Sequence, residues 1–537
     1  MHWLTLLLGV AFLGAVVYRA QQKKTSKAKI YEFPGPYQVP YIGRIHDLPI
    51  QYMWLKFYEW AKTYGPIYQT SMLGAKFIII SDEKIAEDLL VKRAKIYSDR
   101  PQIRSLFDAK STYGSMEYLP LMGRNKYWSR QRRFTHSYLT EATNNQYYGV
   151  MNFEAKRFLN NLLINPDNFG FWLEDMASKI MCQLTWDDTS FSAMYTQNAW
   201  GLLTQMSPAG PITNLITPLW ELPIPINPWK KAERIRHDEQ QALWMKLLLN
   251  TRAKLEKGEA RSCFTKTYLQ NEKTTNLSGD YEASSVIGMM ALVGIFTVAG
   301  PLWYFLAAMA LHPEWQKRVQ EEIDEQCEGR MPTLDDAPKL PILRACIVET
   351  LRWKPNVPTG VAHEVEADDW YNGCFIAKGS RILPLDWAFM HNEDKYPDSY
   401  NYHPERYLEE KWPTYKEPLT QFPTVKGLTS FGFGQRQCLG QSLTHDELIV
   451  ACGALCWGFN MKKKINPKTG KEIEIDINKS NSLLIVKPDA FQMAFEPRTQ
   501  DRRKEIVHQW EVAEKKDIEE RAEFLRSAKA NFVTVAA

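Results

Sequence analysis

The sequence has little net charge, and it lacks the repeats and biased segments of fibrous or disordered proteins. Its 66 Lys and Arg residues stand against 62 Asp and Glu residues, which leaves a formal net charge of +4 over 537 residues. So small an excess is not the charge pattern of a nucleic-acid-binding protein. The contents of 45% hydrophobic and 24% charged residues are ordinary for a globular chain. These features exclude a disordered tail protein and a fibrous repeat.

Paired metal-binding cysteines are also missing. None of the eight cysteines falls in a CxxC pair. Cys452 and Cys456 lie in one apolar helical run, and no second pair of ligands follows them. We therefore interpret both as core thiols rather than zinc ligands, and we expect them to be reduced if the chain faces the cytosol.

Acidic residues are absent from the first 30 positions, where the only charged residues are one arginine and four lysines. These follow residues 1–18, which contain no Asp, Glu, Lys or Arg. As a helix that run spans about 27 Å, close to the about 30 Å hydrocarbon core of a bilayer. A cleaved signal peptide carries its basic residues before the apolar run, and a buried helix does not explain the basic flank.

Because Lys and Arg favour the cytoplasmic side of a membrane, the sequence predicts a single-pass transmembrane helix at 1–20. We expect this helix to lie in membrane lipid, with the rest of the chain in the cytosol. A basic flank and a proline-rich hinge follow at 21–45, where the prolines fix an extended link.

The remaining pattern predicts one mainly α domain with minor β at 46–498. A long apolar helix at 283–311 ends at a His-Pro step, because the residue before a proline avoids the helical region. An alternating segment at 76–81 is typical of a strand, and 357–385 is typical of short strands broken by glycines. The charged tail at 499–537 is either a surface helix or disordered.

The most informative segment is 431–440, which reads Phe-Gly-Phe-Gly-Gln-Arg-Gln-Cys-Leu-Gly just before a helical run. Glycines let a backbone approach a flat ligand closely, and backbone N–H groups at a helix N-terminus stabilise a thiolate. Arg436 offers a fork of donors to a carboxylate. This chemistry favours a metal-bound thiolate at Cys438, and a glycine-rich turn around a buried thiol is the alternative.

The same segment resembles the haem-binding signature of the cytochrome P450 family: Phe, two residues, Gly, one, Arg, one, Cys, one, Gly. Its five fixed positions are filled by Phe431, Gly434, Arg436, Cys438 and Gly440. At average residue usage, a chance match in a chain of this length has a probability on the order of 10⁻⁴. The resemblance implies the cytochrome P450 fold with an N-terminal transmembrane helix, and haem b held by Cys438 as the axial iron ligand.

Two further segments resemble the family's buried charge network. Residues 349–352 (Glu-Thr-Leu-Arg) are similar to its ExxR motif, and 404–407 (Pro-Glu-Arg-Tyr) to its PERF element, with Tyr in place of Phe. Taken alone, a Glu and an Arg on one helix face are usually an exposed pair that contributes little. The resemblance implies that Glu349, Arg352 and Arg406 form one network that fixes the core beside the haem.

Three more residues match the family's donors to the haem propionates. Trp128 and Arg132 resemble its WxxxR helix motif, and His363 aligns with a donor between strands. Indole and guanidinium groups donate hydrogen bonds and propionates are anions, so the chemistry is consistent. From the residues alone, a basic helix face and an ordinary structural histidine remain the alternatives.

The long helix departs from the family's pattern. In most members an acid and an alcohol on this helix relay protons to bound O₂. Counting back from the His-Pro step aligns Phe296 with the acid and Thr297 with the alcohol, so Thr297 is predicted to be catalytic together with Cys438. A helical threonine can instead bond back to its own turn. The following Gly300-Pro301 pair predicts a kink.

The substrate pocket comes by resemblance only, and its residues are mostly apolar, which suits a lipophilic ligand. They are Val293, Phe296, Val357, Val361 and Leu483.

The resemblance implies a haem-thiolate monooxygenase that oxidises a lipophilic small molecule with O₂. Its electrons would come from an NADPH–cytochrome P450 reductase, because no flavin domain fits in the remaining sequence, and no nucleic-acid partner is expected. The pattern is most similar to eukaryotic microsomal members, above all fungal enzymes of secondary metabolite biosynthesis. That likeness implies the endoplasmic reticulum membrane, with the catalytic domain in the cytosol.

Two alternatives stay open at this point. One is oxidative phenol coupling or rearrangement without oxygen insertion, which the loss of the usual acid at Phe296 favours. The other is a haem-binding membrane protein that is not an enzyme.

Overall fold

A computed structural model of the protein describes residues 31–103, 106, 115–144, 147–207, 210–214 and 217–536. The transmembrane helix predicted at 1–20 and the basic flank up to residue 30 lie outside the described residues.

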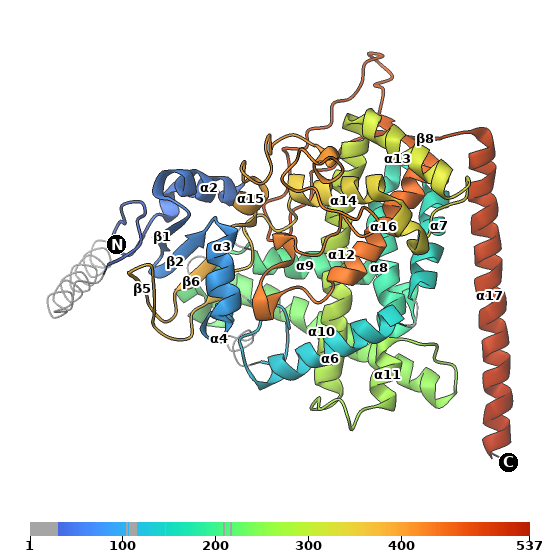
Figure 1. Ribbon diagram of the computed structural model, residues 1–537. Coiled ribbons are helices and arrows are strands. Elements are labelled where there is room, and N and C mark those ends of the chain that lie inside the picture. Colours follow the sequence, from blue (N-terminus) through green and yellow to red (C-terminus); the bar gives the residue numbers. More distant parts are fainter. Residues whose placement is uncertain are drawn as a thin grey trace.

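The body is mainly helical, and its largest sheet lies at one end of it (Figure 1). The α-helices are α2 (Met53–Tyr64), α3 (Glu83–Ala86), α4 (Ala94–Tyr97), α6 (Lys126–Asn144), α7 (Tyr148–Ile164), α8 (Phe169–Trp186), α9 (Ser192–Met206), α10 (Pro228–Glu256), α11 (Phe264–Gln270), α12 (Asp280–Leu311), α13 (Pro313–Gln326), α14 (Pro341–Trp353), α15 (Asp386–Met390), α16 (Gln441–Gly458) and α17 (Gln500–Ala536).

Helix α12 lies at the centre of the helical part (Figure 1) and packs against α8, α9, α10, α14 and α16. In the ranges that the structure describes, it is the one helix long and apolar enough to cross a membrane. Because 83% of its apolar window is buried inside the protein, its composition is that of a core helix, which is apolar on all sides.

The largest sheet has the strand order β1-β2-β6-β3. β1 and β3 pair antiparallel with their neighbours, whereas β2 and β6 run parallel. Three consecutive isoleucines of β2 at 78–80 are fully buried, so this strand is covered on both faces. The strands are β1 (Ile67–Met72), β2 (Ala75–Ile80), β3 (His363–Glu364), β4 (Asp369–Tyr371), β5 (Cys374–Ile376), β6 (Arg381–Pro384), β7 (Phe459–Lys463) and β8 (Met493–Pro497).

The sequence predictions for these elements are confirmed. The alternating segment at 76–81 corresponds to β2, and the glycine-broken segment holds β3 to β6, with Gly373 between β4 and β5 and Gly379 between β5 and β6. The long apolar helix ends at Leu311, before the His-Pro step.

Pro301 lies inside α12, and a neighbouring side chain compensates for its missing N–H. Pro301 cannot donate to the carbonyl of Thr297, four residues earlier. The Nδ2 atom of Asn356 lies 3.4 Å from that carbonyl oxygen and 3.5 Å from the carbonyl oxygen of Phe296. Asn356 follows α14, so its side chain connects the end of α14 to α12 at the position of the missing hydrogen bond.

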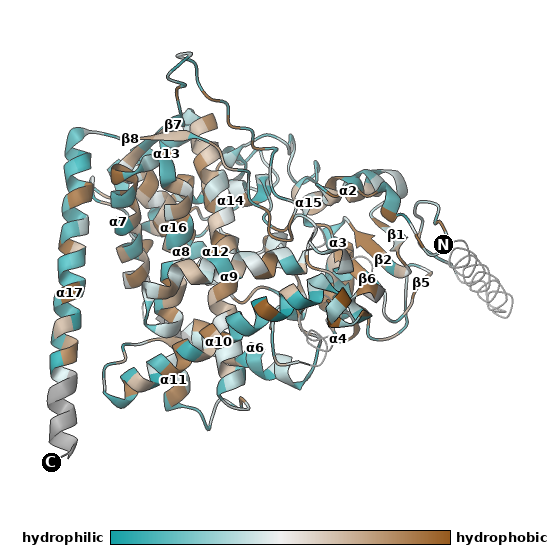
Figure 2. Cartoon of the chain, turned by 180° about the vertical axis from the view of Figure 1, so that it is seen from behind, coloured by the Kyte–Doolittle hydropathy of each residue, from teal (hydrophilic) through white to brown (hydrophobic). Residues whose placement is uncertain are grey.

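The charged tail forms a helix, α17, which lies along one side of the body and extends past it (Figure 1). Most of its coloured residues are hydrophilic (Figure 2). Near its start Ile506 is 1% exposed, and the ring of Trp510 lies 5.3 Å from that of Phe153 on α7. The guanidinium of Arg157 covers both rings, at 5.0 and 5.3 Å. The N-terminal half of the tail is therefore packed against the folded body.

We expect Ile506→Ala to lower the free energy of unfolding by about 2–5 kcal/mol, because it leaves a cavity under α17. Ile518→Ala on the same helix is the matched control: Ile518 is 62% exposed, and we expect a change within about 0.5 kcal/mol. Urea unfolding followed by circular dichroism measures both, and equal effects would contradict the packing described for α17.

Candidate functional site

The loop that precedes α16 is closed by a backbone hydrogen bond. The N–H of Cys438 donates to the carbonyl oxygen of Phe431 at 2.8 Å. Gly432 and Gly434 have φ angles of 76° and 54°, in the left-handed region that favours glycine. A Cβ at Gly434 would lie 2.2 Å from the carbonyl oxygen of Leu90. At Gly434 the missing side chain thus makes room for the protein's own backbone, rather than for the flat ligand that the sequence pattern favoured.

Cys438 is solvent-accessible, yet many protein atoms surround its thiol. Its side chain is exposed, whereas six of the other seven cysteines are buried. Burial nevertheless raises the pKa of its thiol, and the Gly440 backbone N–H and the Arg132 guanidinium act in the opposite direction. A sulfur that is accessible and still desolvated by the surrounding chain faces an enclosed space. This is the position that a thiolate ligand of a bound metal centre requires.

Arg436 is a buried cation that the protein leaves partly unpaired. Its Nε donates to the carbonyl oxygen of Ser98 at 2.7 Å, whereas its Nη1 and Nη2 are buried and have no hydrogen-bond partner among the residues that the structure describes. The guanidinium lies 4.3 Å from the ring centroid of Trp128. Burial, and then repulsion by Arg100, lowers the pKa of Arg436 to about 8. Such a group is costly to bury unless an anion meets it.

Two further arginines gather at the same place. Nη2 of Arg132 donates to the carbonyl oxygen of Gln437 at 2.7 Å. Nη1 of Arg100 donates to the carbonyl oxygens of Val361 and Ala362 at 2.8 and 2.7 Å. Burial lowers the pKa of both, and that of Arg100, which Arg132 also repels, falls to about 9. We call Arg100, Arg132 and Arg436 the arginine cluster.

Arg100 is the member that sequence analysis missed. It is 7% exposed, and it matches no motif that we used. Its neighbour Asp99 accepts backbone N–H bonds from Arg100 and Arg124 at 2.9 and 2.7 Å, and its charge offsets part of the cluster. A single arginine carries no sequence signal, so only its burial beside two other guanidinium groups identifies it.

His363 lies at the same place, on β3, and is 2% exposed. Its Nδ1 lies 2.7 Å from the carbonyl oxygen of Tyr97, so Nδ1 carries the proton. Burial, with Arg100 and Arg436, holds the pKa of His363 well below its usual value. The neutral ring has no proton on Nε2, so the predicted donation to a propionate requires the cationic ring, which a nearby anion favours.

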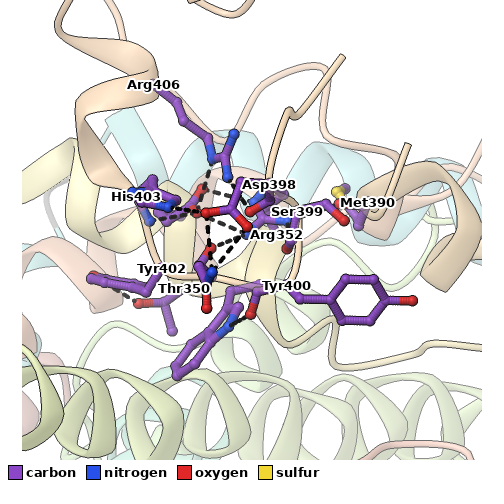
Figure 3. A network of polar contacts seen from close by, with 12 residues as sticks. Thr350, Arg352, Met390, Asp398, Ser399, Tyr400, Tyr402, His403 and Arg406 are labelled. Atoms are coloured by element: carbon purple, nitrogen blue, oxygen red, sulfur yellow. Dashed lines mark hydrogen bonds and ion pairs between the residues drawn. The ribbon is translucent and has the colours of Figure 1, made fainter. Parts of the chain in front are cut away.

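A second buried charge group joins α14 to the segment that follows α15. Glu349 and Arg352 are both fully buried, and Nε and Nη2 of Arg352 each lie 2.8 Å from a carboxylate oxygen of Glu349. Nε of Arg406 lies 3.3 Å from the same carboxylate. Arg352 also donates to the carbonyl oxygens of Met390 and Ser399 at 2.9 and 2.7 Å (Figure 3).

The same group fixes the chain around 397–403. Nη2 of Arg406 donates to the carbonyl oxygen of Asp398 at 2.7 Å, and Nη1 donates to that of Pro397. The backbone N–H of His403 donates to Glu349 at 2.9 Å. The structure thus brings together the three residues that the resemblance linked, and backbone carbonyls surround its two arginines.

On α12 the two aligned residues point in different directions. The hydroxyl of Thr297 donates to the carbonyl oxygen of Val293 at 2.6 Å, within its own helix. Phe296 is 4% exposed, with its ring 5.7 Å from that of Trp200 on α9 and 5.4 Å from Nζ of Lys487. It borders a cavity of about 340 Å³ between α8, α9 and α12. The ring in place of the acid therefore faces the α8–α9 side of the helix.

The other predicted pocket residues are half-buried. Val293 and Leu483 pack against the main hydrophobic cluster. Their role in substrate binding stays a prediction, as does that of the remaining two, Val357 and Val361.

Comparison with known proteins identifies the family. The family model described as "Cytochrome P450" matches residues 33–494, which is most of the chain. The chain belongs to the cytochrome P450 family. Members of this family bind haem b through an axial cysteine thiolate. The chain is an oxidoreductase of that family, so the alternative of a haem-binding protein without enzymatic activity is rejected.

Similar proteins come from fungi. The chain is 30% identical to "Cytochrome P450 monooxygenase virE" of Hypocrea virens over 487 residues, covering 89% of this chain and 87% of that protein. It is 28% identical to "Cytochrome P450 monooxygenase fogE" of Aspergillus ruber, with 89% of each chain covered. It is 31% identical to "Cytochrome P450 monooxygenase claR" of Ampulloclitocybe clavipes, with 87% and 86% covered.

The residues present fit haem b. The unpartnered Nη1 and Nη2 of Arg436 and the mutual repulsion within the arginine cluster call for carboxylates, which the two haem propionates supply. Cys438 offers an accessible sulfur to the iron. In the described part of the chain, no group of three or more His, Cys, Asp and Glu residues is arranged to hold a bare metal ion, and haem iron needs a single protein ligand here.

We expect Arg436→Gln to weaken the binding of haem to the apoprotein by about tenfold or more, because hydrogen bonds to charged groups contribute about 1.5–3 kcal/mol. The same change should leave the apoprotein at least as stable as the wild type, because it removes an unpaired buried charge. Haem titration and thermal unfolding of the apoprotein measure the two effects, and Arg503→Gln on the exposed surface of α17 is the control. Lower apoprotein stability with unchanged haem affinity would show that Arg436 serves the fold alone.

We expect Glu349→Gln to lower the free energy of unfolding by about 3–5 kcal/mol, because it leaves Arg352 and Arg406 buried without their anion. Glu496→Gln is the matched control: its pair with Lys462 is more than half exposed on both sides, so we expect a loss within about 1 kcal/mol. Chemical denaturation measures both, and a small loss for Glu349→Gln would refute the structural role of the network.

Proposed function

We propose that the protein is a membrane-anchored haem-thiolate monooxygenase of fungal secondary metabolite biosynthesis, which oxidises a lipophilic small molecule. The observation that supports it best is the accessible but desolvated Cys438 together with the unpartnered donors of Arg436. The fungal relatives named as monooxygenases agree with this reaction class.

In this proposal each part of the site has one task. Cys438 is the axial ligand, and the arginine cluster with Trp128 binds the propionates. When bound, the haem activates O₂ with electrons supplied one at a time, and the thiolate favours cleavage of the O–O bond. The electrons come from an NADPH–cytochrome P450 reductase. The half-buried apolar side chains Val293, Val357, Val361 and Leu483 line a lipophilic pocket, which accounts for the substrate class.

The proposal includes an anchor in the endoplasmic reticulum membrane, with the catalytic domain in the cytosol. It rests on the uncharged run at 1–18 and on the five basic residues that follow it. An apolar helix that reaches only just across the bilayer suits a membrane of less than average thickness, such as that of the endoplasmic reticulum.

A second candidate reaction is oxidative coupling or rearrangement without oxygen insertion. Two observations favour it: Phe296 occupies the position of the usual acid and faces α8 and α9, and the Thr297 hydroxyl is bonded to its own helix. Turnover under ¹⁸O₂ with a co-expressed reductase separates the two reactions. Label in the product supports the monooxygenase, and unlabelled product supports coupling or rearrangement.

We expect Cys438→Ala to abolish the strong red shift of the Soret band of the reduced CO complex, because only a thiolate ligand produces it. Cys374→Ala, at the half-buried cysteine of β5, should retain the shift. Difference spectra at equal haem content measure this, and a full red shift in Cys438→Ala would overturn the assignment of the axial ligand.

A further inference from the structure

Asp386 is a buried carboxylate that contacts the loop carrying Cys438. It begins α15 and is 2% exposed. One of its oxygens, Oδ1, accepts a hydrogen bond from the hydroxyl of Thr429 at 2.5 Å, and the other, Oδ2, from the hydroxyl of Ser430 at 2.7 Å. Both oxygens of one acid are therefore held by two successive residues of another segment.

Those two residues lead directly into the closed loop. Phe431, which follows Ser430, accepts the N–H of Cys438 at 2.8 Å through its carbonyl oxygen. The path from Asp386 to the sulfur-bearing residue thus consists of two side-chain hydrogen bonds, one peptide unit and one backbone hydrogen bond. Gly432 bends the chain immediately after it, with a φ of 76°.

Asp386 itself is fixed to the rest of the protein. The N–H of Leu385 donates to the carbonyl oxygen of Ile80 in β2, and that of Trp387 to Pro358, both at 2.9 Å. Helix α15 also packs against α2 (Figure 1). The backbone on both sides of Asp386 is therefore bonded to strand β2 and to the segment after α14. The carboxylate connects these elements to the loop that carries Cys438.

Helix capping and ion pairing do not account for this acid. The hydrogen bonds of its side chain run to Thr429 and Ser430, outside its own short helix. The charged groups that face it are Glu83 and Lys395, which pair with each other at 2.7 Å. Burial raises the pKa of Asp386 to about 6, while the two hydroxyl bonds lower it. A buried acid that no cation contacts within the described ranges is costly, which argues for a task beyond stability.

We propose that Asp386 is a positioning residue for the axial cysteine, which holds the 429–431 turn so that Cys438 keeps the orientation in which its sulfur is accessible. This rests on the proposed role of Cys438 as the iron ligand. In this proposal Asp386 acts through its hydrogen bonds to Thr429 and Ser430.

The test compares variants that remove the link with one that retains it. Asp386→Ala and the double variant Thr429→Val/Ser430→Ala each remove both hydrogen bonds. Asp386→Asn keeps one oxygen that accepts a hydrogen bond. Its amide NH2 group can donate a hydrogen bond to the oxygen of the other hydroxyl. Thermal unfolding of each apoprotein shows whether it is folded, and the reduced CO spectrum at equal haem content shows the share of thiolate-bound haem.

We expect Asp386→Ala to lower the ratio of red-shifted to unshifted Soret forms by about two- to tenfold for each lost hydrogen bond. The double variant Thr429→Val/Ser430→Ala should lower the ratio to the same extent. Combining all three changes should lower it no further, and Asp386→Asn should restore most of the wild-type ratio. If Asp386→Ala does not fold, Ser430→Ala, at a half-buried side chain, removes one bond only and carries the same comparison.

Two results separate the failure of this proposal from that of the function on which it rests. If Asp386→Ala has the wild-type ratio at equal haem content while Cys438→Ala loses the red shift, Asp386 is not a positioning residue and the axial ligand stands. If Cys438→Ala keeps the red shift, the axial assignment itself is wrong, and the role of Asp386 falls with it.

Discussion

The structure depends on a concentration of positive charge that the protein does not neutralise by itself. Arg100, Arg132 and Arg436 are drawn together by backbone carbonyls and by the ring of Trp128, and burial lowers the pKa of each. Asp99 offsets only part of that charge, and in the described part of the chain two nitrogens of Arg436 have no hydrogen-bond partner. A buried cationic group of this kind is stable when a bound anion completes it. The binding of haem and the folding of this region are therefore linked, because the cofactor supplies the missing carboxylates.

Two other buried acids hold the frame in which this cluster and Cys438 meet. Glu349 gathers Arg352 and Arg406 and thereby fixes α14 to the chain at 397–403. Asp386 binds the turn before the cysteine. Glu349 forms ion pairs whose role is mainly structural, whereas no cation among the described residues contacts Asp386. Glu349 thus stabilises the core, and Asp386 positions the loop that carries Cys438.

Much of this arrangement could be predicted from the sequence where the signal is local. The apolar run of α12, its His-Pro end and the glycine-punctuated strands follow from periodicity and from proline and glycine chemistry. The ten-residue loop with Cys438 and Arg436 has fixed spacing. The sequence therefore predicts Cys438 as the iron ligand, and the family resemblance predicts Trp128, Arg132 and His363 as donors to the haem propionates.

The rest depends on contacts between residues far apart in the chain. Arg100 lies more than 330 positions before Arg436, and no motif around Arg100 predicts that the two side chains lie close together. The direction of the Phe296 ring is set by Trp200 and Lys487, and whether the tail would be helical or disordered was decided by its packing on α7. Asp386 carried no motif, because its role arises from two hydroxyls that are 43 and 44 residues away.

The central claim is that the arginine cluster is built for the two propionates of haem b. Its most direct test is the affinity of the apoprotein for haem compared with haem dimethyl ester, in which both carboxylates are esterified. Loss of the charged partners should weaken binding by about tenfold or more, since hydrogen bonds to charged groups contribute about 1.5–3 kcal/mol. Equal affinity for the two compounds would contradict the account, because the buried arginines would then have no anion to explain them.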